Sequence, residues 1–178
     1  MILAQEDTSK ISSTRSQLYE RYFRRLLRAD NDLTWKGWSV ILEEFAHWFL
    51  LDTGSRGVGI LHEPLIDLMK ESKSLAEKPK TLLERAQEYY DLPIKTELSI
   101  LGILKSAGII QETRQWRFAH DTFGEYFAAG YIISTFERTK TIPNLDCWKI
   151  SDAQVNSFIS VIEFVNERLD ENSIRLLR

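Results

Sequence analysis

Residues 96–129 read TELSILGILKSAGIIQETRQWRFAHDTFGEYFAA, and this stretch decides the fold. Apolar residues recur at helical spacing over 96–107, which predicts a buried helix. Gly108 follows at the place where a left-handed residue commonly closes a helix. Beyond the glycine, 109–112 and 115–119 have the alternation of two short strands and can pair as a hairpin.

The same spacing predicts helices elsewhere in the chain, over 18–28, 35–51, 63–71, 81–90, 121–140 and 152–169. Three compact helices followed by a two-stranded wing is the order of a winged-helix unit. The expected fold is therefore mainly α, a helical bundle with a winged-helix unit that carries a small two-stranded β wing, followed by further helices. Its expected domains are a helical segment over 1–60, the winged helix over 61–120, and a long helix with the start of a C-terminal helical domain over 121–178.

Composition narrows the class of protein without choosing a function. Of 178 residues, 43% are hydrophobic and 28% are charged, which is ordinary for a soluble globular protein. A formal net charge of −3 gives no global attraction for nucleic acid or an anionic membrane. Cys147 is the single cysteine, so an internal disulfide is excluded. No apolar run is long enough to cross a bilayer, and we expect a cytoplasmic protein without a membrane partner.

The segment 117–129, RFAHDTFGEYFAA, carries the most specific pattern in the chain. It resembles the signature of NACHT winged-helix domains: phenylalanine, any residue, histidine, and then glutamate-tyrosine-phenylalanine-alanine-alanine. Two further segments agree. The run LGILKSAGII at 101–110 looks like the helix and wing entry of that family, and SQLYERYFRRLL at 16–27 is similar to the helix that follows its NTPase core.

The resemblance implies a non-catalytic regulatory segment of a NACHT-type STAND NTPase, which senses the ADP or ATP state and controls oligomerisation. No glycine-rich turn ending in Gly-Lys-Ser/Thr is present, so the chain lacks the Walker A loop and we expect no enzyme activity. The implied partners are the NTPase core of the same polypeptide and other protomers. ADP or ATP with magnesium is implied for the parent protein, and no cofactor for the isolated chain.

His120 is the one candidate ligand-binding residue. In the family that the chain resembles, the matching histidine contacts the β-phosphate of ADP, a role that suits an imidazole N–H at a helix N-terminus. Spacing alone favours a simpler role, in which His120 caps the helix or packs beside the wing. The match to the family motif favours the role of His120 in nucleotide binding.

Other chemistries have weaker support in the sequence. His47, His62 and His120 fall on separate predicted elements, without metal-ligand spacing, so we expect no metal site. Gly54-Ser55 lacks the context of a nucleophile elbow, and no catalytic residue is assigned.

Nucleic-acid binding is the first alternative function. Four arginines lie on one side of the first predicted helix: Arg21, Arg24, Arg25 and Arg28. Such a basic face can contact phosphates. Most basic helix faces, however, are solvated or paired with nearby acids. The predicted helix before the wing offers only Lys105, with Lys95 just before it, which makes nucleic acid an unlikely partner. The second alternative is a helical interaction scaffold without a ligand. An exposed Lys105 beside a basic groove would favour the DNA-binding function. An exposed His120 on an empty, flat surface would favour the function as a segment that packs on the missing NTPase core.

Overall fold

The structure is a computed structural model, and it describes residues 14–52, 60–71, 73–74, 79–89, 94–141 and 152–169. Its helices are α1 (Arg15–Leu26), α2 (Asp32–Ala46), α3 (His62–Lys70), α4 (Leu82–Tyr89), α5 (Glu97–Ser106), α6 (Asp121–Thr139) and α7 (Asp152–Arg168), with a π-helical segment at His47–Asp52. The strands are β1 (Lys73–Ser74), β2 (Pro79–Lys80), β3 (Ile110–Glu112) and β4 (Trp116–Phe118). The fold is thus mainly helical with small antiparallel sheets, as predicted.

Side-chain caps fix where several helices begin. Thr14, Asn31 and Thr96 have extended backbones and accept hydrogen bonds from the amides of Gln17, Thr34 and Ser99, at 3.3, 2.8 and 3.2 Å. Each bond satisfies an amide that the first turn leaves without a partner. At the other end of α5, Gly108 has a φ of 68° and so closes the helix as predicted.

The two-stranded hairpin predicted after Gly108 is present. β3 pairs antiparallel with β4 in a register that places Ile110 opposite Phe118 and Glu112 opposite Trp116. Ile60 adds a bridge on the other edge, where its amide and carbonyl bond the carbonyl and amide of Trp116 at 2.9 and 2.8 Å. The start of α3 is therefore tied to the wing by backbone bonds.

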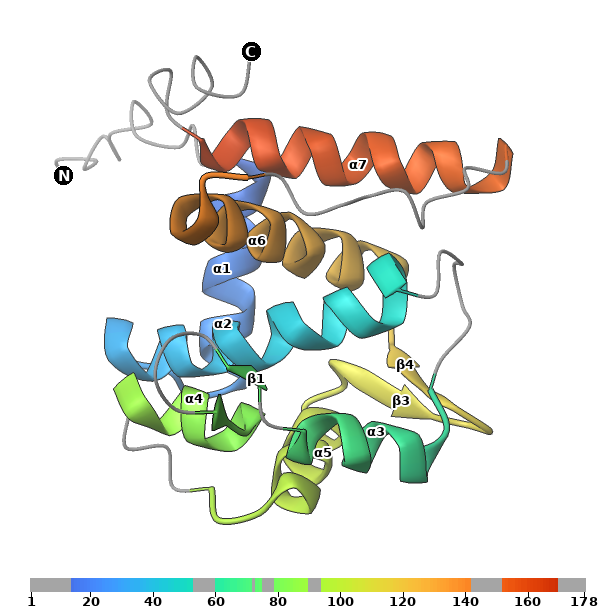
Figure 1. Ribbon diagram of the computed structural model, residues 1–178. Coiled ribbons are helices and arrows are strands. Elements are labelled where there is room, and N and C mark those ends of the chain that lie inside the picture. Colours follow the sequence, from blue (N-terminus) through green and yellow to red (C-terminus); the bar gives the residue numbers. More distant parts are fainter. Residues whose placement is uncertain are drawn as a thin grey trace, which may run out of the picture.

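α2 lies at the centre of the arrangement (Figure 1), and packs against α4 and α6. α7 lies along α6, and α1 also contacts α7. In the view of Figure 1, α3, α5 and the β3–β4 hairpin lie on the side of α2 away from α7. One cluster of buried side chains runs through these layers, and its largest members include Phe23, Phe45, Trp48, Tyr126, Phe127 and Phe164.

Two details differ from the expectation. The helix expected over 35–51 starts earlier, at Asp32, because Asn31 caps it, and it changes to π-helical geometry from His47 onward. The pair β1–β2 was not predicted, since two-residue strands leave no periodic signal. Gly54 and Ser55 lie outside the described residues. No helix in the described part of the chain is long and apolar enough to span a membrane.

Candidate functional site

His120 sits between the wing and α6. It is the N-cap residue of α6, with a φ of −133° and a ψ of 139°, and its side chain makes no cap hydrogen bond. The residue is exposed, and its backbone is held by a bond from the Phe123 amide to the His120 carbonyl at 3.0 Å. Within the described residues, the ring's recorded contact is an edge-to-face packing on Phe123 with centroids 4.9 Å apart. Among the described residues, neither ring nitrogen has a hydrogen-bond partner.

Aromatic side chains link His120 to the first helix. Phe123 is 7% exposed and packs edge-to-face on Phe23 at 5.0 Å, while Tyr22, 48% exposed, lies 5.9 Å from the Phe123 ring. The surface from Tyr22 to His120 is thus continuous and partly apolar. A rigid base of this kind holds an imidazole in one place, which lowers the entropic cost of using it in binding.

The N-terminus of α6 is not strongly cationic by itself. Asp121 places a carboxylate in the first turn, where the helix dipole already favours negative charge. An anion bound here would compete with the Asp121 carboxylate for the same favourable interaction with the N-terminal end of the helix dipole. His120 could therefore contribute one contact to a phosphate, but tight binding would need donors from another domain.

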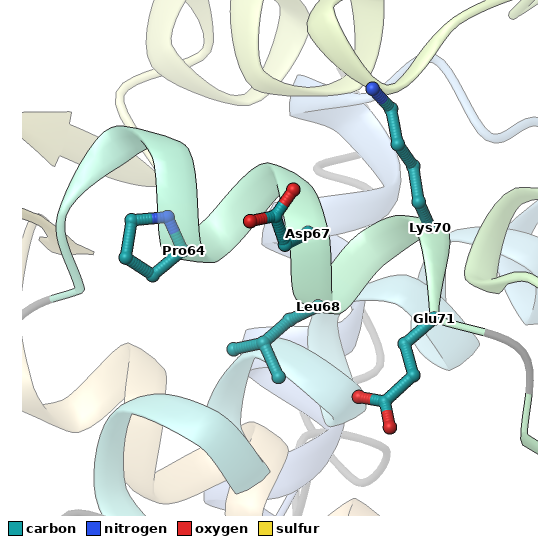
Figure 2. Close-up of a pocket in the computed structure, with 5 residues that line it drawn as sticks. All are labelled: Pro64, Asp67, Leu68, Lys70 and Glu71. Atoms are coloured by element: carbon teal, nitrogen blue, oxygen red, sulfur yellow. The ribbon is translucent and has the colours of Figure 1, made fainter.

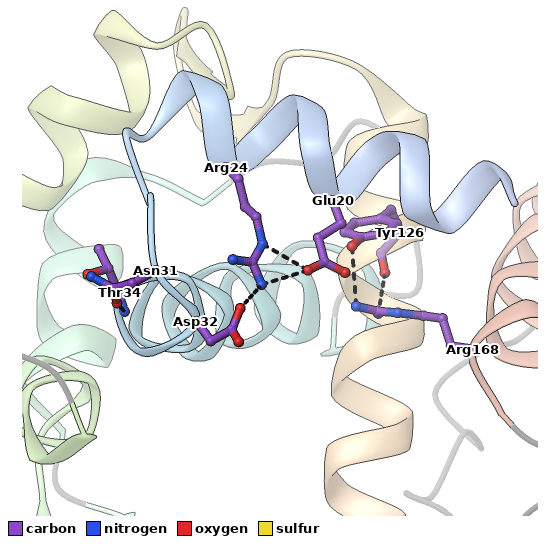
Figure 3. Close-up of polar contacts among 7 residues, drawn as sticks. All are labelled: Glu20, Arg24, Asn31, Asp32, Thr34, Tyr126 and Arg168. Carbon is purple, nitrogen blue, oxygen red and sulfur yellow. Dashed lines mark hydrogen bonds and ion pairs between the residues drawn. The ribbon is translucent and has the colours of Figure 1, made fainter. Parts of the chain in front are cut away.

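The four arginines singled out in the sequence divide into two groups. Arg24 is engaged, since its Nη2 lies 2.8 Å from Glu20 Oε1 and 2.7 Å from Asp32 Oδ1, as Figure 3 shows. Arg21, Arg25 and Arg28 are exposed, and they have no ion-pair partner among the described residues. The Glu20–Arg24 pair has the i,i+4 spacing that the sequence could have indicated, whereas the contact with Asp32 depends on the turn after the helix.

Lys105, the cation on α5, is engaged. Its Nζ lies 2.9 Å from Glu112 Oε2 on β3 and 5.4 Å from the Trp116 ring centre. On the same side, Trp116 Nε1 donates to His62 Nδ1 at 3.0 Å. A base-reading lysine would have to leave these partners first. Lys105 is thus exposed, as the DNA-binding alternative requires, but its ammonium group is already paired with a carboxylate.

Sequence reasoning missed a partly buried polar cluster between α2, α6 and α7. Ser134 Oγ donates to Glu43 Oε2 at 3.0 Å, and the pKa of Glu43 is raised to about 7 by burial of its carboxyl group. The charge of Arg168 and the Ser134 bond oppose this rise, whereas Glu44 and Glu137 add to it. The three helices are thus joined through an ionisable group with a perturbed pKa.

Arg168 ties α7 to α6 in the same region. Its Nη1 and Nη2 donate to the backbone carbonyl and hydroxyl of Tyr126 at 3.4 and 3.3 Å, contacts that Figure 3 marks. The guanidinium also lies 4.5 Å from the centre of the Tyr126 ring. Burial raises the pKa of Tyr126 to about 12, so the hydroxyl stays protonated. The cluster is enclosed by helices, and it is structural in the first instance.

The histidines are not brought together. His47 stacks on Tyr131 with centroids 4.4 Å apart, His62 bonds Trp116, and His120 packs on Phe123. A search of the described residues finds no group of three histidine, cysteine or acidic side chains that could hold a metal ion. Cys147 lies outside the described residues.

Comparison of the chain with protein-family models, with curated proteins and with solved structures gives no match.

Proposed function

We propose that this chain is a non-catalytic regulatory segment of a NACHT-type STAND NTPase, in which His120 contributes to sensing bound ADP. The observation that carries the proposal is the position of His120. Its imidazole is exposed at the start of α6, held by Phe123, and has no hydrogen-bonding partner among the described residues. Because a histidine that only capped α6 would bond the helix amides, this geometry favours an external ligand.

The arrangement of residues 60–118 supports a winged-helix unit in this proposal. α3, α4 and α5 precede the β3–β4 hairpin, and Ile60 bridges to Trp116 as a third, minimal strand. We assign 61–120 to the winged helix, 1–60 to the helical segment after the NTPase core, and 121–178 to the long helix and the start of a further helical domain.

The NTPase core of the same polypeptide is the proposed partner of the surface around His120. Tyr22 and His120 are exposed on either side of Phe123, so a core docked here would cover aromatic surface and complete the phosphate contacts. Exchange of ADP for ATP would weaken this docking and release the segment, which would permit contact with other protomers of a cytoplasmic signalling protein. Magnesium and most phosphate donors would belong to the core.

Two other functions have less support. A DNA-binding winged helix would need a free basic face on α5, and Lys105 is engaged by Glu112. A helical scaffold without a ligand is consistent with the packing, and it differs from our proposal only in that His120 binds no ligand. The test must therefore measure nucleotide retention and stability separately.

We would test the proposal in the full-length parent protein with His120→Ala, and in the isolated chain with the same change. Loss of one charge-assisted donor, worth about 1.5–3 kcal/mol, should weaken ADP binding by roughly ten- to a hundredfold. The melting temperature of the isolated chain should stay nearly unchanged, because the side chain is exposed. The isolated wild-type chain should neither hydrolyse ATP nor bind it tightly.

His62→Ala is the matched control, since it removes the histidine that accepts a bond from Trp116. It should lower the melting temperature of the isolated chain and leave ADP affinity of the parent unchanged. Unchanged ADP affinity in the His120→Ala parent would contradict the proposal and favour the scaffold.

A further inference from the structure

The outer face of α1 carries unpaired cations beside an exposed leucine. We define the basic stripe as Leu18, Arg21, Arg25 and, just past the helix end, Arg28. Leu18 is 54% exposed, and none of the three arginines has an ion-pair partner among the described residues. Arg21 and Arg25 are one turn apart, so their like charges repel. The stripe faces away from the side of α1 that buries Phe23.

The outer face of α3 carries the opposite charge. We define the acidic stripe as Glu63, Asp67 and Glu71, which recur at four-residue spacing and are exposed without an ion-pair partner among the described residues. Among the described residues, no ion pair relieves the repulsion between successive carboxylates. The opposite side of α3 is buried through Leu65 and Met69.

An open depression of about 670 Å³ adjoins the acidic stripe (Figure 2), lined by Pro64, Asp67, Leu68, Lys70 and Glu71. Pro64 and Leu68 give it apolar surface, and Lys70 is the one cation in the lining. In the figure, Lys70 and Glu71 point in opposite directions from the end of α3. The lysine therefore leaves an excess of negative charge along Glu63, Asp67 and Glu71.

We propose that the basic stripe of one copy of this chain docks on the acidic stripe of a second copy, with Leu18 seated against Pro64 and Leu68. Arg21 and Arg25 have the same four-residue spacing as Glu63, Asp67 and Glu71, and residues four apart lie about 6 Å apart along any α-helix. Charge complementarity and an exposed apolar residue beside an open depression select this occupant over a neutral partner. The contact needs no nucleotide and no NTPase core, so it stands independently of the proposed function.

The two stripes lie on different elements, α1 and α3. The contact is therefore heterologous: each copy offers one stripe to one neighbour and the other stripe to the next. Such contacts form rings or open filaments and not a closed two-fold dimer. Exposed ion pairs each strengthen association by only a small factor, so self-association of the isolated chain is weak and falls as salt rises.

Charge reversal tests the pairing directly. One variant carries Arg21→Glu and Arg25→Glu, and the other carries Glu63→Arg and Asp67→Arg. In sedimentation equilibrium at low salt, the wild-type chain should self-associate as its concentration rises, whereas each variant alone should stay monomeric. An equimolar mixture should associate, because the two reversed stripes then meet each other with opposite charge, and so do the two unreversed stripes.

Two further measurements make the result specific. Leu18→Ala should weaken association several-fold, whereas Leu33→Ala, at a residue 64% exposed on α2 outside both stripes, should not. Circular dichroism should show unchanged helix content. If a reversed variant loses helix, Arg21→Gln with Arg25→Gln replaces it, and that variant should also be monomeric.

Several outcomes would overturn the proposal. They are a wild-type chain that stays monomeric at every concentration, association that survives reversal of either stripe, and a mixture that remains monomeric. A monomeric chain that binds duplex DNA through Arg21 and Arg25, measured by fluorescence anisotropy, would assign the basic stripe to nucleic acid instead.

Discussion

The Oε1 atom of Glu43 lies 2.5 Å from the point that a Cβ atom on Gly130 would occupy, and Arg168 Nη1 lies 2.7 Å from the same point. Because Gly130 on α6 has no side chain, the ends of a carboxylate side chain from α2 and a guanidinium side chain from α7 occupy the space beside it. Four predictions follow from this relationship and from the caps and ion pairs around it.

Gly130→Ala should stabilise the chain less than an ordinary glycine-to-alanine change in a helix. The added methyl would push aside the ends of the flexible Glu43 and Arg168 side chains, and the main loss is the hydrogen bond from Ser134 to Glu43, worth about 0.5–1.5 kcal/mol. Gly102→Ala is the control, because a Cβ there meets nothing within 4 Å. It should stabilise by about 0.5–1 kcal/mol through helix propensity. Urea denaturation of both variants measures the difference, and equal effects would contradict our account of Gly130.

Glu43→Gln should change how stability depends on pH. Burial raises the folded-state pKa of Glu43 to about 7 from an ordinary value of 4.5. The folded state then holds more protons than the unfolded state, so this group's stabilisation is complete below about pH 4.5 and is lost as pH rises toward 7.

Glutamine does not ionise, so the Glu43→Gln variant does not lose this stabilisation as pH rises. Relative to wild type, its unfolding free energy should rise by roughly 2–3 kcal/mol between pH 4.5 and 7.5 and then level off. Urea denaturation across this range measures the effect. Glu71→Gln, at an exposed carboxylate, should show no comparable trend. A Glu43→Gln curve parallel to that of wild type would refute the prediction.

Arg85→Met should be strongly destabilising. Arg85 Nη1 of α4 lies 2.7 Å from Glu44 Oε1 of α2, and the two side chains are 10% and 9% exposed. Removing the arginine breaks a buried ion pair, and loss of one partner of such a pair costs about 3–5 kcal/mol. The double change Arg85→Met with Glu44→Met should recover much of that loss, as measured by thermal or urea unfolding.

An exposed pair provides the comparison. Lys80 and Glu88 also form an ion pair, but they are 36% and 45% exposed. Lys80→Met should cost at most about 1 kcal/mol, because solvent screens the pair. A cost as large as that of Arg85→Met would mean that burial does not control these pairs.

His120→Ser should stabilise the isolated chain. The His120 backbone already has the extended N-cap conformation, yet its side chain makes no cap bond. A serine there can accept from the first turn of α6, which is worth about 0.5–1 kcal/mol. Thr96→Ala is the opposite change, since it removes an existing cap bond to Ser99, and it should cost about 1 kcal/mol. Stability lost in His120→Ser would show that the imidazole itself supports the fold.

The sequence by itself determined the helices and the wing. Their signals are local: apolar spacing, the cap residue Thr96, and Gly108 in a left-handed conformation at the end of α5. It also singled out His120, whose position between β4 and α6 follows from the order of elements. These features depend on residues a few positions apart, which is the range over which a periodic pattern carries information.

Only the tertiary structure decided which polar groups meet. Glu43 and Gly130 look like ordinary helix residues until α6 packs on α2, and Arg168 reaches them from the far end of the chain. The tertiary structure likewise showed that Arg24 is paired with Glu20 and Asp32, whereas Arg21 and Arg25 have no ion-pair partner among the described residues. A local pattern reports which face of a helix is apolar, whereas the pKa of a carboxylate depends on burial and on charges that distant segments bring near it.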